Sequence, residues 1–141
     1  MGWFLTTILL PVVAPNVMLA IWRAWVHLPG VDPGRLKPLV PLKDGQLCWA
    51  AIGFCASGLY ELFEPGRVFD PQLRELFLTA LVVLLAASSV VAGGGAVFPA
   101  PDKPAGVKWH THYKALKGSL VLTAASAIAY TLVHFPPGAA K

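Results

Sequence analysis

The feature that most constrains this chain is a series of long apolar runs. Short polar segments that are rich in proline separate the runs from one another. The runs cover residues 3–26, 45–63, 73–98 and 115–135. A helix needs about 20 apolar residues to cross the hydrocarbon core of a bilayer. A single segment in this core must be helical, because only a helix hydrogen-bonds the backbone N–H and C=O groups within the segment itself. We therefore predict an all-α fold, a polytopic membrane protein with four transmembrane helices in one small bundle and a single domain over residues 1–141.

Composition supports this fold class. Hydrophobic residues make up 56% of the 141 residues and charged residues only 13%, whereas a soluble domain carries about 25% charged residues. Mean hydropathy is +0.63. The net charge is +4, but its basic residues lie between the apolar runs, which is typical of topology signals and argues against a nucleic-acid partner. We expect the lipid bilayer itself to be the main partner, and no cofactor is indicated.

The first run allows two interpretations. Trp3 and Trp22 are nineteen residues apart, or about 28 Å along a helix, which suits tryptophans at both membrane interfaces. Pro11, Pro15 and Asn16, however, fall near the middle of the run. We predict a full crossing, and the alternative is a re-entrant segment beside three transmembrane helices. Further along the chain, Asp44 is the predicted N-cap of the second helix, and Asp70, followed by proline, that of the third.

Orientation follows from the basic residues of the short connections. Eight of them flank the first and third connections: Arg23, Arg35, Lys37, Lys43, Lys103, Lys108, Lys114 and Lys117. Only Arg67 and Arg74 flank the second. We therefore predict connections 27–44 and 99–114 to be cytoplasmic and both termini to be outside, in what we expect to be a bacterial inner membrane.

Pro11, Pro15 and Asn16 form the first candidate site. Each proline removes a backbone donor, which predicts a kink or an unwound turn in mid-membrane. The Asn16 amide must find a polar partner there, because hydrocarbon offers none. The two interpretations are a kinked helix whose asparagine binds a neighbouring helix, which we favour, and a pore lining or gate.

Two carboxylates and one basic cluster form the remaining candidate sites. Glu61 and Glu64 close the second run at the outer edge, where we expect anchoring and ion pairs with Arg67 or Arg74, and alternatively a divalent cation or a pore mouth. The basic and aromatic cluster comprises Lys108, Trp109, His110, His112, Tyr113 and Lys114. We expect this cluster to lie in the membrane interface; its two histidines suggest zinc only weakly, so no metal site is predicted.

Small residues recur along the second and fourth runs: Ala51, Gly53, Cys55, Ser57, Ser119, Thr123, Ala125, Ser126 and Ala129. Such faces let helices approach closely. The sequence leaves open whether they pack within the chain or between copies of it.

Three hypotheses of function follow. The first is a non-catalytic membrane protein that acts by self-association, as a homo-oligomer, or by docking to a membrane partner, in an immunity, defence or accessory-subunit role. The alternative is an oligomeric pore or channel, or a holin-like permeabilising protein. The least favoured is a membrane-embedded enzyme using His110 or Glu61, because the sequence holds no P-loop, HExxH or Ser-His-Asp pattern.

Overall fold

The computed structural model describes residues 2–25, 42, 44–65, 69–99, 101, 106 and 114–136. Over these residues the regular structure is helical, without a strand, which confirms the all-α prediction. The helices are α1 (Gly2–Phe4), η1 (Leu5–Leu9), α2 (Leu10–Trp25), α4 (Cys48–Leu62), α5 (Pro71–Val97) and α7 (Lys114–His134). α1, η1 and α2 follow one another without a break, and each of the other three lies within or close to one of the predicted apolar runs.

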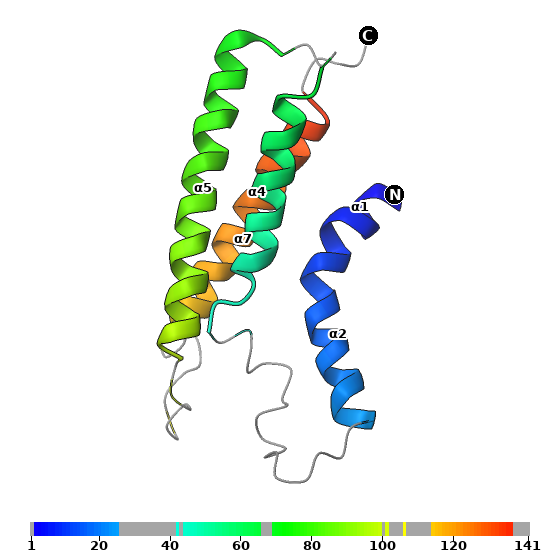
Figure 1. Ribbon diagram of the computed structural model, residues 1–141, viewed down its shortest axis with the longest axis vertical. Coiled ribbons are helices and arrows are strands. Elements are labelled where there is room, and N and C mark those ends of the chain that lie inside the picture. The colour runs from blue at the N-terminus through cyan, green and yellow to red at the C-terminus, as the bar shows by residue number, and fades with distance from the viewer. Residues whose placement is uncertain are drawn as a thin grey trace.

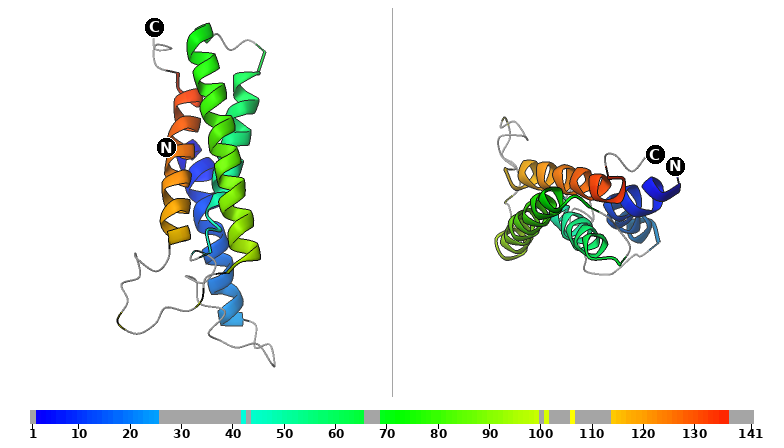
Figure 2. Two further views of the ribbon diagram at one scale, coloured as in Figure 1. Left: turned by 90° about the vertical axis from the view of Figure 1, so that its left-hand side faces the viewer. Right: turned by 90° about the horizontal axis from the view of Figure 1, so that it is seen from above.

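Helices α4, α5 and α7 pack on one another as a three-helix bundle (Figure 1). α5 runs antiparallel to α4, and α7 runs antiparallel to α5, so α4 and α7 end at the same end of the bundle (Figures 1 and 2). The N-terminal helix lies beside this bundle and contacts it through its first turns, where Ile8 packs with Phe54 and Tyr130. The chain start and the end of α7 are therefore neighbours.

The start of α5 follows the predicted N-cap. The Asp70 carboxylate accepts hydrogen bonds from the backbone N–H groups of Gln72 (3.0 Å) and Leu73 (3.3 Å), and Pro71 is the first helical residue. The prediction for Asp44 is wrong. α4 begins only at Cys48, after a turn over residues 44–47 in which Gly45 has a φ of +80°, a conformation that favours glycine.

A π-helical segment precedes Pro11 in the N-terminal helix. The N–H of Leu10 donates to the carbonyl of Leu5, five residues back, and regular α-helix resumes from Leu10 to Trp25. Because proline has no N–H to continue the α-helical pattern, a wider turn just before it is physically reasonable. The backbone stays helical through Pro15 and Asn16.

The core lies between α4, α5 and α7. Cys55, Leu62, Leu81 and Val133 form one buried cluster, and Leu81 and Val133 are fully enclosed. Within the described part of the chain, two helices, α5 and α7, are long and apolar enough to cross a membrane. The apolar segments Gly2–Ala14 and Cys48–Leu62 are shorter.

Candidate functional site

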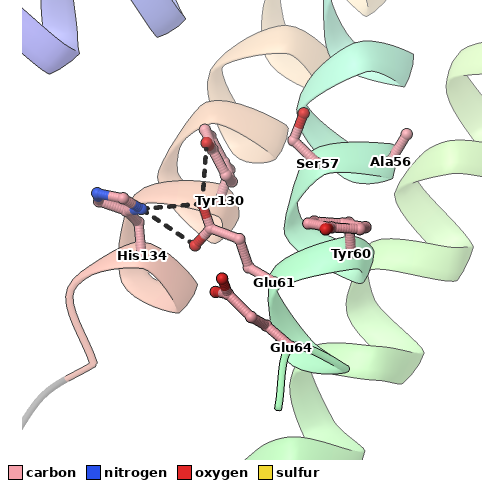
Figure 3. Close-up of a pocket in the computed structure, with 7 residues that line it drawn as sticks. All are labelled: Ala56, Ser57, Tyr60, Glu61, Glu64, Tyr130 and His134. Atoms are coloured by element: carbon pink, nitrogen blue, oxygen red, sulfur yellow. Dashed lines mark hydrogen bonds and ion pairs between the residues drawn. The ribbon is translucent and has the colours of Figure 1, made fainter. Parts of the chain in front are cut away.

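A polar cluster joins the last turns of α4 and α7. Glu61 comes from α4, and its carboxylate oxygens lie 2.9 and 3.0 Å from Nδ1 of His134, at the end of α7 (Figure 3). The Tyr130 hydroxyl, one turn earlier on α7, donates to the same carboxylate at 3.2 Å. The Glu61 carboxylate therefore bridges two side chains of one helix face and ties the two helix ends together.

Aromatic rings cover this cluster on the side of the N-terminal helix. The Trp3 indole stacks on the His134 ring with centroids 4.2 Å apart and planes 10° apart. Phe135 meets the His134 ring edge-on at 4.6 Å, and Phe54 lies parallel to the Tyr130 ring at 6.3 Å. Such ring pairs stabilise by about 0.5–1.5 kcal/mol each beyond their area burial. The start of the chain is thus held against the end of α7.

The Glu61–His134 pair is largely shielded. The His134 side chain is 23% exposed and that of Glu61 14%, while Tyr130 is buried. A charge-assisted hydrogen bond is stronger in such surroundings than in water, and removing one partner leaves a costly unpaired group. These residues therefore form a strong link between α4 and α7.

A pocket of about 560 Å³ opens beside this pair (Figure 3). Its walls come from the last turns of α4 and α7: Ala56, Ser57, Tyr60, Glu61, Glu64, Tyr130 and His134. The lining combines two carboxylates with two phenol rings, an imidazole and a hydroxyl. Among the described residues, no three histidine, cysteine or acidic side chains are grouped closely enough to hold a metal ion.

Small residues form the contact between α4 and α7, which we call the α4–α7 seam. Ala51 and Cys55 of α4 and Ser119, Thr123 and Ser126 of α7 are all buried. The Cys55 thiol lies 3.4 Å from the Ser126 hydroxyl, and the Thr123 hydroxyl lies 3.0 Å from the Leu47 carbonyl. These small residues therefore serve packing within the chain, which decides the question that the sequence left open for them.

Small residues also occupy a second surface, which faces away from the bundle. On α5, Ala86, Ser89 and Gly93 are exposed and lie on one helix face by their spacing, together with the exposed Val82 and Val97. Leu81, Ser88 and Ala92 form the buried face of the same helix. We call the first group the outer face of α5.

The structure brings only part of the predicted sites together. Glu61 and Glu64 line one pocket, but the described partners of Glu61 are His134 and Tyr130. The Arg74 guanidinium lies over the Phe63 ring, 5.1 Å from its centroid. Arg67, the other proposed partner, lies outside the described residues.

The structure describes the other two candidate sites only in part. Pro11 is exposed on α2, while the side chains of Pro15 and Asn16 are not described, so the gate stays a prediction. In the basic and aromatic cluster, Lys108, Trp109, His110, His112 and Tyr113 fall outside the described residues. Lys114 is the exposed first residue of α7.

Sequence analysis missed Trp3, Tyr130 and His134 as parts of one site. His134 is 73 residues from Glu61, and no spacing rule connects them. One sequence property pointed toward His134: a histidine in the last turn of an apolar helix interacts favourably with the negative end of the helix dipole.

Comparison of the chain with models of protein families, with curated proteins and with solved structures finds no match. The function must therefore be argued from the residues themselves.

Proposed function

We propose that this chain is an integral membrane protein with four crossings that acts without catalysis, by self-association through the outer face of α5. The observation that carries this proposal is the placement of Ala86, Ser89 and Gly93 on an exposed apolar helix face. Immunity, defence and accessory-subunit proteins of membranes are roles of this class.

Helix lengths support the membrane placement. α5 has 27 residues and α7 has 21, which correspond to about 40 and 31 Å of helix and match or exceed a hydrocarbon core of about 30 Å. The N-terminal helix over residues 2–25 is about 36 Å long. α4, at 15 residues or about 22 Å, is shorter than this core, and its proposed crossing includes the turn over residues 44–47.

Exposed apolar side chains support the same placement. Val83 is 61% exposed, Val90 is 74% exposed and Val121 is 68% exposed, on two different helices. Other large apolar side chains are exposed on every helix of the described residues, and lipid tails solvate such side chains without the cost that water imposes. Charged residues lie near the helix ends instead, with Arg74 and Glu75 in the first turns of α5 and Lys114 and Lys117 in the first turn of α7.

The glycines of α5 differ in whether they serve packing within the chain or leave a surface open to another molecule. A Cβ at Gly95 would collide with the backbone of Asp44, so this glycine serves packing within the chain. A Cβ at Gly93 or Gly94 would meet no atom of the described residues within 4 Å. Glycine inside a helix costs about 1 kcal/mol relative to alanine, and at Gly93 no contact with the described residues offsets this cost.

A second copy is the partner that suits this face. In lipid, helices associate by close backbone approach, and faces of small residues permit it. Two copies of α5 can meet by the same surface, as an isologous contact requires. Ala86, Ser89 and Gly93 extend over about two turns, enough for one helix crossing.

The test is the oligomeric state of the purified chain in mild detergent and in lipid nanodiscs, measured by native mass spectrometry. We expect discrete oligomers, which Gly93→Leu converts to monomers. Gly94→Leu is the matched control, because it makes the same change about 100° around the helix, where a Cβ also meets open space. A wild-type chain that stays monomeric in both media would overturn the proposal, as would equal effects of the two variants.

Crossing is tested separately by labelling with a membrane-impermeant maleimide. Gly2→Cys should react from outside the cell, and Pro101→Cys should react only after permeabilisation. Cys48 and Cys55 have no exposed surface and should stay unlabelled. Labelling of both new cysteines from the same side would contradict the proposed topology.

A further inference from the structure

We propose that the pocket beside Glu61 and His134 binds an ammonium group, either that of a zwitterionic lipid headgroup or that of a free amine. This inference is independent of self-association, because every wall of the pocket comes from one chain. It rests on the charge, the aromatic lining and the helix ends that surround the pocket.

The two carboxylates set the charge preference. Glu61 and Glu64 are one turn apart near the end of α4, and both line the pocket (Figure 3). Carboxylates near an apolar environment attract cations and give strong charge-assisted hydrogen bonds to N–H donors. The Glu61 carboxylate is oriented by His134 and Tyr130, so it is already fixed in place before a ligand arrives.

The backbone adds to this preference. α4 ends at Leu62 and α7 ends at His134, so the C-terminal turns of two helices meet at the pocket. A helix C-terminus carries a partial negative charge and favours a cation within its last turn. Two such ends together disfavour an anionic ligand at this position.

The aromatic lining selects an organic cation. Tyr60 is 76% exposed and presents its phenol ring at the pocket, where a ring face attracts ammonium groups by the cation–π interaction. Tyr130 is buried, and its hydroxyl lies at the Glu61 carboxylate. The volume of about 560 Å³ falls in the range of about 300–1,000 Å³ that is typical of small-molecule pockets. A bare metal ion fits less well, because no group of three metal ligands is found among the described residues.

The position of the pocket explains why two sources of the ammonium group must be compared. In the proposed membrane placement, the ends of α4 and α7 lie at the outer edge of the bilayer. Headgroups of phosphatidylethanolamine lie at this level, and soluble amines also reach it from the water. Ser57, which lines the pocket, adds a hydroxyl that suits either ligand.

The lipid arm compares phosphatidylethanolamine with phosphatidic acid, which differ by the ethylammonium group. Native mass spectrometry of the detergent-purified chain should show the ethanolamine lipid binding at least about tenfold more tightly, as expected for one charge-assisted hydrogen bond. The amine arm titrates ethanolamine in solution and follows binding by calorimetry. Preference in the lipid arm alone identifies the headgroup as the source, and binding in the amine arm alone identifies a free amine.

Glu64→Gln is the test variant, because it keeps the side-chain shape at an exposed position and removes one charge. We expect it to weaken binding in the responding arm about tenfold. Glu75→Gln is the control, since Glu75 is exposed on α5 at the same end of the bundle but does not line this pocket. The proposal is overturned if neither arm shows binding, if phosphatidic acid binds as tightly as the ethanolamine lipid with no amine binding, or if the two variants behave alike.

Discussion

The α4–α7 seam and the outer face of α5 are both rich in small residues, yet they have opposite surroundings. In the seam, Cys55 and Ser126 are fully buried and in contact across the two helices. On the outer face, Ser89 is exposed, and its hydroxyl donates to the Leu85 carbonyl of its own helix at 2.8 Å. The seam is therefore covered by a neighbouring helix of the same chain. On the outer face, the Ser89 hydroxyl is hydrogen-bonded within its own helix.

This difference shows that a small-residue pattern marks a place for close approach without identifying the approaching helix. The consecutive glycines of α5 make the point most sharply. Gly95 is pressed against the Asp44 backbone, while Gly93 faces open space two residues away. A structure is needed to separate the two roles, and substitutions on either surface should have different kinds of effect.

The largest effect is expected for Gly95→Leu, which places a side chain where the Asp44 backbone already lies. Because a backbone segment must move, we expect a loss of about 3 kcal/mol of stability. The thermal unfolding midpoint in detergent, followed by circular dichroism, measures it. Gly94→Leu should leave the midpoint nearly unchanged; similar midpoints for both variants would show that the contact with Asp44 is not a packing constraint.

Leu81→Ala should have the next largest effect. Leu81 is fully enclosed between the helices of the bundle. In water a Leu→Ala change in a core costs about 2–5 kcal/mol, but helices that separate within lipid keep their apolar surroundings, so we expect about 2 kcal/mol. Leu76→Ala is the control, since Leu76 is 63% exposed on the same helix. Equal unfolding midpoints for the two variants would contradict the assignment of the buried face.

A smaller effect should appear as coupling between Gly58 and Leu81. A Cβ at Gly58 would lie 3.0 Å from Cδ1 of Leu81, so the leucine must give way in Gly58→Ala. In the Leu81→Ala background the same methyl group fills part of the cavity. A double-mutant cycle should therefore give about 1 kcal/mol of favourable coupling. Additive effects would mean that the two positions do not touch.

Sequence analysis predicted those parts of the fold that depend on local chemistry. The apolar runs gave the helices, and Asp70 with Pro71 gave the start of α5, because an N-cap acts within three residues. The prediction for Asp44 failed for a non-local reason. The backbone of Asp44 packs against Gly95 of α5, and the adjacent Gly45 adopts a positive φ, so the chain turns before α4 begins.

The candidate site was also predictable only where local sequence features indicate its residues. Glu61 was found because a carboxylate at the end of an apolar run is costly and therefore conspicuous. Trp3 and His134 were missed because they meet Glu61 only when three helices are assembled. No periodicity in the sequence connects residues at the two ends of the chain, so this part required the structure.

The smallest effect is expected from Thr123→Val, which tests the hydrogen bonds of the α4–α7 seam. The Thr123 hydroxyl lies 3.0 Å from the Leu47 carbonyl of the neighbouring segment and 2.7 Å from the Ser119 carbonyl of its own helix. Thr131→Val is the control. In the described structure the Thr131 hydroxyl contacts only a carbonyl of its own helix, the Ala127 carbonyl at 2.7 Å. Interhelical hydrogen bonds in membranes contribute about 0.6 kcal/mol on average, so Thr123→Val should lower the unfolding midpoint by a small amount and Thr131→Val by less. An effect as large as that of Leu81→Ala would mean that polar contacts, more than the fit of small side chains, hold the seam together.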